Sequence, residues 1–199
     1  FFPKLIPEIS LVHWRSVLKG TSGLAQSLLL SFLLSAIVSF TATTLAFFTS
    51  RYLFLSNKAD LWKKMALLPF IISPIIYAIS INFFFNYSNI SASAIGFSIA
   101  LMFVVYPYAM LLFSGFWNAK HRATQQLVAT LGGNAFLQWR SGIWPQAKQV
   151  FYTCLFQSFL IAWFDFGFTQ YIGLGKVKTL TIQVYQLVAE GNPYVAAAD

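Results

Sequence analysis

Long apolar intervals without a charged residue dominate this chain, and polar turns separate them. No Lys, Arg, Asp or Glu lies in residues 20–50 or in residues 65–119. A helix of about 20 apolar residues crosses the hydrocarbon core of a bilayer, so residues 65–119 are too long for one crossing. They divide at "NYSNISAS" (86–93), where Asn and Ser side chains favour a turn. The pattern therefore predicts membrane-spanning helices near residues 24–50, 65–86, 92–117 and 150–173.

Two segments outside these spans have the pattern of structure at a membrane surface. Residues 1–19 carry two prolines and mixed charge, which predicts an extended lead-in followed by a short amphipathic helix. In residues 174–193 the apolar positions fall on one side of a predicted interfacial helix. We expect both segments on the external face. Prolines also occur inside the predicted spans, as packing kinks or as bends that line a solute path, at Pro69, Pro74 and Pro107.

Composition places the chain among membrane proteins. Of its 199 residues 58% are hydrophobic and 9% are charged, against about 25% charged residues in soluble domains. So few charges could not cover a soluble fold of this length, and we expect a bilayer to solvate much of it. We therefore predict an all-α, polytopic transmembrane helical bundle forming one domain, residues 1–199. Because the chain begins at Phe1 and ends at Asp199 as it turns apolar, we expect it to be a fragment of a longer protein.

The net charge of +8 reflects orientation in the membrane and not nucleic-acid binding. Eight of the 13 basic residues fall in residues 51–64 and 117–149. Because basic residues gather in cytoplasmic loops, this distribution predicts that residues 118–148 form a cytoplasmic loop.

Signatures of catalysis or of metal binding are scarce. His13 and His121 have no Cys, Asp or His at metal-ligand spacing, and the adjacent glycines at 132 and 133 lack the Lys-Ser/Thr of a P-loop. The five acidic residues are dispersed, and the single cysteine, Cys154, excludes an internal disulfide. We therefore predict no catalytic residue, no metal site and no cofactor in this chain.

Asp165 is the acid of the predicted span 150–173, and an acid at the centre of a membrane helix costs at least about 2.5–3.5 kcal/mol. Two interpretations stay open. In one, Asp165 faces a polar translocation path. In the other, it lies near the outer interface and shapes a helix end together with Gly167.

The cytoplasmic loop has a pattern of its own. Residues 118–131 can form a helix that ends at Gly132-Gly133, and Asn134 can cap a second, short helix. Its apolar positions fall on one side, at Phe136, Trp139 and Ile143, and Pro145 then precedes the next span. Such a pair of helices makes a compact knob with an exposed aromatic face. It either lies on lipid headgroups or fills a socket in a soluble partner.

The stretch "QLVATLGGNAFLQWRSGIWPQ" (126–146) resembles the EAA loop of the permeases of binding-protein-dependent ABC importers. The family pattern is E-A-A, three residues, G, nine residues, I, any residue, L-P. Gly132 and Pro145 match it identically, whereas Gln126 stands where the pattern has Glu. The ending "DFGFTQYIGLGKVKTLTIQVYQLVAEGNPYVAAA" (165–198) is similar to the iron(III), thiamine, polyamine and sulfate branch, and it implies that the first and last membrane helices are missing here.

The resemblance implies a type I ABC importer permease in the bacterial cytoplasmic (inner) membrane. It implies four kinds of partner: cytoplasmic ABC ATPase subunits that hold the ATP and Mg, a second permease subunit or half, a periplasmic or lipid-anchored solute-binding protein, and the bilayer. The residues assigned to ATPase docking are Gln126, Ala129, Gly132, Phe136, Trp139 and Pro145. Two other classes stay open: an ion-coupled carrier or channel that uses Asp165 without an ATPase, and a membrane scaffold that transports nothing.

Overall fold

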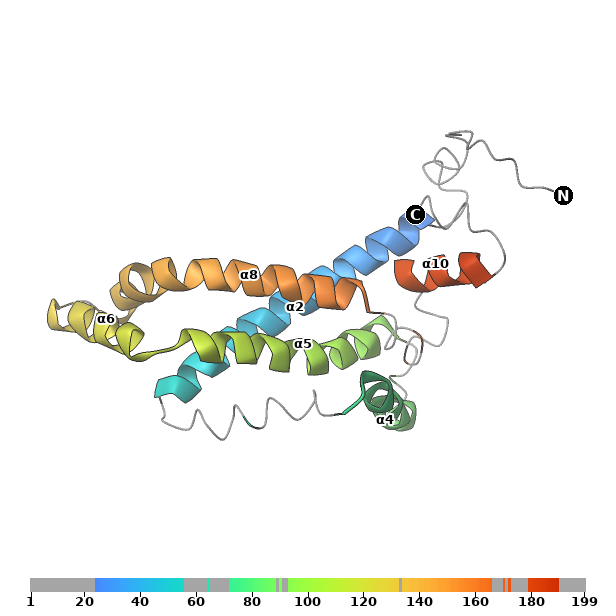
Figure 1. The fold of residues 1–199 in the computed structure, drawn as a ribbon, viewed down its shortest axis with the longest axis horizontal. Helices are drawn as coiled ribbons and strands as arrows, with labels where there is room; N and C mark the ends of the chain where they lie inside the picture. Colours follow the sequence, from blue (N-terminus) through green and yellow to red (C-terminus); the bar gives the residue numbers. More distant parts are fainter. Residues whose placement is uncertain are drawn as a thin grey trace, which may run out of the picture. The chain divides into compact units, whose positions relative to one another are not determined.

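The structure is a computed structural model that describes residues 24–55, 72–88, 93–132, 134–165 and 179–189, and the single positions 64, 90, 170 and 172. Within these ranges there is no strand, which confirms the all-α prediction. The elements are α2 (Leu24–Leu55), α4 (Pro74–Tyr87), α5 (Ala94–Phe116), α6 (Ala119–Thr130), α7 (Ala135–Leu137), the π-helical stretch η1 (Gln138–Ile143), α8 (Trp144–Trp163) and α10 (Leu180–Ala189) (Figure 1).

The chain divides into two compact units, residues 1–33 with 178–199 and residues 34–177. In the first unit, the described residues are the start of α2 and the helix α10. The backbone N–H of Leu180 donates to Ser31 Oγ at 2.8 Å, which satisfies one of the free N–H groups at the start of α10. The helix predicted within residues 174–193 is therefore present. The segment 1–19 lies outside the described residues.

Helix α2 is long because nothing in its sequence interrupts it. Residues 24–55 contain neither Gly nor Pro. Several of its hydroxyl side chains turn back to carbonyls of the preceding turn, as Thr41 Oγ1 does to Ile37 (2.7 Å) and Thr49 Oγ1 to Leu45 (2.8 Å). These back-bonds satisfy the hydroxyl groups that make them without water.

The burial pattern of α2 differs from that of a soluble helix, because small hydroxyl residues share its buried side and many large apolar residues are exposed. Every fourth residue from Ser27 to Thr43 is a small hydroxyl residue, and all of these are buried. Large apolar side chains such as Ile37 and Phe40 are exposed instead. Soluble helices bury their large apolar residues. Among the described helices, residues 25–55 and α5 are long and apolar enough to cross a membrane.

The turn between α4 and α5 lies in the Asn- and Ser-rich stretch, where the sequence predicts it. Helix α4 ends at Tyr87, and α5 begins after Ser93, whose Oγ accepts from the N–H of Gly96 at 3.0 Å. A side chain at Gly96 would collide with the carbonyl of Ile90, so this close approach requires glycine.

The three prolines of the predicted spans have different positions. Pro107 lies inside α5, as expected. The expectation for Pro74 is wrong, because this proline starts α4 instead of lying within a helix. Proline is favoured in the first turn of a helix, where its missing N–H would have no partner. Pro69 lies outside the described residues.

In the second unit, α5 and α8 run alongside each other in opposite directions, and α2 crosses them (Figure 1). The core lies where the C-terminal parts of α2 and α5 meet the start of α8, and Phe47 is at its centre. Its side chain is 1% exposed, and its ring is 5.1 Å from that of Phe113 and 5.7 Å from that of Phe151. These edge-to-face contacts fix the three helices at the end that carries residues 119–143.

Candidate functional site

Residues 119–143 form a helical hairpin at the end of the second unit, and Asn118 starts its first arm. Trp117 is extended and so ends α5. In the first turn of α6, the backbone carbonyl of Asn118 then accepts a hydrogen bond from the N–H of His121 at 3.1 Å. The His121 ring is buried, and it lies 4.2 Å from the ring of Phe116. The first arm is therefore held against the end of α5.

Gly132 makes the turn of the hairpin. Its φ is +79°, and its N–H donates to the carbonyl of Ala129 at 3.0 Å. A Cβ at this position would meet nothing within 4 Å. The backbone conformation, and not a lack of space, is therefore what requires glycine here. The predicted glycine turn is confirmed at Gly132, while Gly133 lies outside the described residues.

Asn134 caps the second arm, as predicted. Its Oδ1 accepts from the N–H of Leu137 at 2.9 Å, and its carbonyl accepts from the N–H of Gln138 at 3.0 Å. Beyond this cap the structure differs from the sequence-based expectation, because the arm does not end before Pro145. The elements α7, η1 and α8 succeed one another without a break.

The π-helical turn explains how the arm continues through Pro145. A proline lacks the N–H that an α-helix needs, and its ring crowds the preceding turn. In η1 the N–H of Trp144 bonds to the carbonyl of Trp139, one residue further back than in an α-helix. The side chain of Gln146 then donates to the carbonyl of Gly142 at 3.0 Å. Pro145 thus lies in the first turn of α8, which ends at Trp163 instead of residue 173.

The two arms pack closely at Gly142. This glycine is buried, and a Cβ on it would lie 3.6 Å from Cγ2 of Val128 and 4.0 Å from Cγ2 of Thr124. A methyl group therefore fits between the arms, whereas a longer side chain would push α6 away.

The docking residues assigned from the sequence do not all face the same way. Gln126, Ala129, Gly132 and Phe136 are exposed, Phe136 by 66%. Trp139 is instead half-buried against α2. Ile143, expected on the same exposed side, is 2% exposed. The predicted exposed aromatic face is therefore wrong for Trp139 and Ile143, because the apolar cluster formed by α2, α5 and α8 covers that side of the hairpin.

Three leucines near the glycine turn are also exposed, which the sequence pattern had not indicated. Together with Phe136 they form what we call the tip: Leu127, Leu131, Phe136 and Leu137. No charged residue occurs from position 123 to position 139. That uncharged run, centred on the glycine turn, is the signal that could have identified them.

A polar notch of about 430 Å³ lies beside the tip. It is lined by Leu55, Gln125, Gln126, Ala129 and Gln138. Nε2 of Gln125 is buried and has no hydrogen-bond partner in the described part of the chain. The notch therefore offers amide groups and no charge to whatever contacts it.

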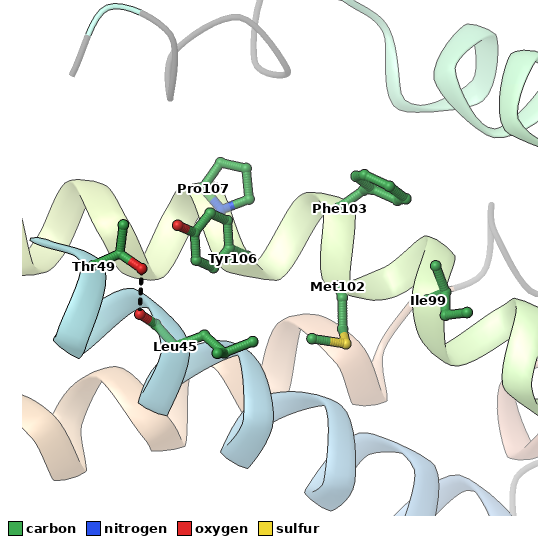
Figure 2. Close-up of a pocket in the computed structure, with 7 residues that line it drawn as sticks. All are labelled: Leu45, Thr49, Ile99, Met102, Phe103, Tyr106 and Pro107. Carbon is green, nitrogen blue, oxygen red and sulfur yellow. Dashed lines mark hydrogen bonds between the residues drawn. The ribbon is translucent and has the colours of Figure 1, made fainter. Parts of the chain in front are cut away.

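A second hollow, of about 390 Å³, lies between α2 and α5 (Figure 2). It is lined by Leu45, Thr49, Ile99, Met102, Phe103, Tyr106 and Pro107. Pro107 leaves the carbonyl of Phe103 without its helical donor. The hydroxyl of Thr49 is turned to the carbonyl of Leu45 (Figure 2). A lining this apolar does not match a charged solute.

Asp165 lies apart from the hairpin. Asp165 comes after the last residue of α8, Trp163, whereas the hairpin comes before its first residue, Trp144. The two therefore lie at opposite ends of this helix. Asp165 is thus positioned beyond a helix end and not within it. Gly167 lies outside the described residues. Among the described residues, no group of three His, Cys, Asp or Glu side chains could hold a metal ion.

The site can therefore bind by shape and by apolar contact, through the tip and the notch. In comparisons with known proteins, no protein-family model matches this chain, and no curated protein matches it significantly.

Proposed function

We propose that this chain is a transmembrane permease subunit of an ATP-driven ABC importer, and that the hairpin docks on a cytoplasmic ATPase subunit. The observation that carries the proposal is the tip itself: four large apolar side chains displayed around a glycine turn on a firmly packed base. Exposed apolar patches of this kind mark contact surfaces. An amphipathic helix docks in a partner groove through such anchors.

The membrane part of the proposal is supported by α2 and α5. Both helices are long and apolar enough to cross a bilayer, and α2 exposes many of its large apolar side chains, such as Ile37 and Phe40. Small hydroxyl residues facing inward, such as Ser35 and Ser39, let neighbouring helices approach closely in lipid. The membrane is the bacterial cytoplasmic membrane, which the chain crosses several times.

The ATPase part of the proposal rests on the hairpin and on the EAA-loop resemblance together. Gly132 and Pro145 are the residues identical to that pattern. Gly132 lies at the turn of the hairpin, and Pro145 lies in the first turn of α8, shortly after the π-helical stretch. ATP and Mg belong to the partner subunits. A second permease subunit or half would complete the solute path, and an external binding protein would deliver the solute.

The ion-coupled alternative receives less support from the geometry. A coupling carboxylate is expected within a membrane helix, facing a path. Asp165 instead follows the end of α8. Transport that persists in vesicles without any ATPase subunit, and that is lost in Asp165→Asn, would favour this alternative.

The glycine turn provides a test that does not depend on knowing the solute. In Gly132→Val the left-handed conformation costs about 1–2 kcal/mol, so we expect the hairpin to lose its shape. The full-length protein would be affinity-purified from its own cell membranes, and vanadate-sensitive ATP hydrolysis that co-purifies would be measured. We expect that activity to fall about tenfold, the equivalent of 1.4 kcal/mol of docking energy.

Two control variants separate docking from folding. Gly115→Val adds the same side chain on α5, where a Cβ meets nothing within 4 Å, and should leave the co-purifying activity unchanged. Gly132→Asn should retain most of it, because Asn tolerates the left-handed region. Full ATPase recovery with Gly132→Val would refute the proposal.

A further inference from the structure

The residue that leads into the hairpin is tied by its side chain to α2. The indole N–H of Trp117 donates to Oγ of Ser50 at 3.0 Å, and Ser50 in turn donates to the carbonyl of Phe47 at 2.9 Å. The Trp117 ring also stacks on that of Phe54, with centroids 6.1 Å apart and planes inclined by 22°. We call the two residues at the base of the hairpin, Trp117 and Trp139, its roots. The first root is therefore held against residues 47–54.

The second root, at Trp139, is fastened to the same stretch. Its ring stacks on that of Phe48 with centroids 5.7 Å apart and planes inclined by 10°. The guanidinium carbon of Arg51 lies 5.0 Å from the Trp139 ring centroid, within the range of a cation–π interaction. Nε of Arg51 is buried and has no hydrogen-bond partner among the described residues. The Trp139 ring is thus a partner that stabilises this cation.

These contacts join parts of the chain that are far apart in sequence. The hairpin is continuous with α5 and α8, yet both of its roots are bound to α2. Helix α2 is also the helix with the buried hydroxyl stripe, which includes Ser35, Ser39 and Thr43. A displacement of the hairpin would therefore reach those hydroxyl groups through a single rigid helix.

We propose that Trp117 and Trp139 clamp both roots of the hairpin to residues 47–54 of α2, so that α2 moves with the hairpin and changes the access of water to its hydroxyl stripe. Trp117, Trp139 and Arg51 are then positioning residues. This inference rests on the proposed function, because the ATPase partner supplies the displacement.

A cysteine reporter on α2 tests the clamp. In a Cys154→Ser background, Ser35→Cys places one thiol on the stripe with little change in volume. Vesicles from the cell's own membranes would be treated with a small, water-soluble methanethiosulfonate, with and without ATP. We expect ATP to change the modification rate in the protein with the intact clamp. Trp139→Leu should reduce that change about threefold or more, the weight of one cation–π contact, while ATP hydrolysis continues.

Matched variants separate the clamp from simple packing. Trp139→Phe keeps an aromatic face for Phe48 and Arg51 and should restore the response. Arg51→Gln removes only the cation and should weaken it. Trp144→Leu removes another indole of the same cluster. The described ring contacts of Trp144 are to Trp139, Phe151 and Tyr152 and none is to α2, so this variant should leave the response largely intact.

The outcomes distinguish this inference from the proposed function. If ATP hydrolysis is present but Ser35→Cys never responds to ATP, or responds equally with Trp139→Leu and Arg51→Gln, the clamp is refuted and the permease proposal stands. If no ATP hydrolysis accompanies the protein with the clamp intact, the proposed function itself fails.

Discussion

The base of the hairpin and its tip are built in opposite ways. At the base, Phe47 is 1% exposed and touches the rings of Phe113, Trp117, Trp139 and Phe151. At the tip, Leu131 is 79% exposed. The apolar side chains of the base are buried in contacts within the chain, whereas those of the tip are exposed.

This difference shows where stability and function are separated. Interlocking rings hold the hairpin in one orientation, since aromatic pairs have preferred geometries. The tip contributes little to that packing, and we propose that its exposed apolar side chains contact a partner. Variants at the base should therefore change stability, and variants at the tip should change binding.

The largest expected effect is at the centre of the base. Phe47→Ala should lower the free energy of unfolding by about 3–5 kcal/mol, because it leaves a cavity among several rings. Thermal unfolding in detergent, followed by circular dichroism, would measure the loss. Phe40→Ala, an exposed phenylalanine on the same helix, should cost much less. Equal losses for the two variants would break the distinction between base and surface.

An intermediate effect is expected where the two arms of the hairpin meet. Gly142→Leu should lower the free energy of unfolding by about 1–3 kcal/mol, because the longer side chain would overlap Val128 and separate the arms. Gly142→Ala should be tolerated, since its Cβ would make an ordinary contact at 3.6 Å. The same unfolding measurement compares them. A destabilisation as large for alanine as for leucine would show that the arms lie closer than described.

The smallest effect on stability is expected at the tip. Leu131→Ser should change the free energy of unfolding by no more than about 0.5 kcal/mol, as surface substitutions usually do. It should nevertheless lower the co-purifying ATPase activity about tenfold, which corresponds to the binding free energy lost at a modest interface hot spot. Tyr87→Ser, an exposed side chain at the end of α4, should change neither quantity. Loss of stability with retained ATPase binding would reverse the assignment of the tip.

The local features of the hairpin could be predicted from the sequence because each depends on a few neighbouring residues. The turn at Gly132 requires only a left-handed backbone, and the cap at Asn134 requires only a side-chain oxygen one turn before Leu137. The break between α4 and α5 likewise depends on local residues, such as Ser93, which caps α5.

The orientation of Trp139 could not be predicted in the same way. Its neighbours Phe48 and Arg51 lie far away in the sequence, and helical spacing alone does not show which side of a short helix another helix covers. The same holds for Pro145. A proline at this position predicts that the helix ends, yet the π-helical turn before Pro145 allows the helix to continue.

The central claim is that the tip touches an ATPase subunit, and photo-crosslinking tests it most directly. A benzophenone side chain would replace Phe136 at the tip or, as the control, Phe156 on α8, which is similarly exposed. After irradiation of the cell's own membranes, adducts would be identified by mass spectrometry. We predict that the probe at 136 is joined to an ABC ATPase subunit and that the probe at 156 is not. Adducts of the 136 probe with lipid alone would contradict the account.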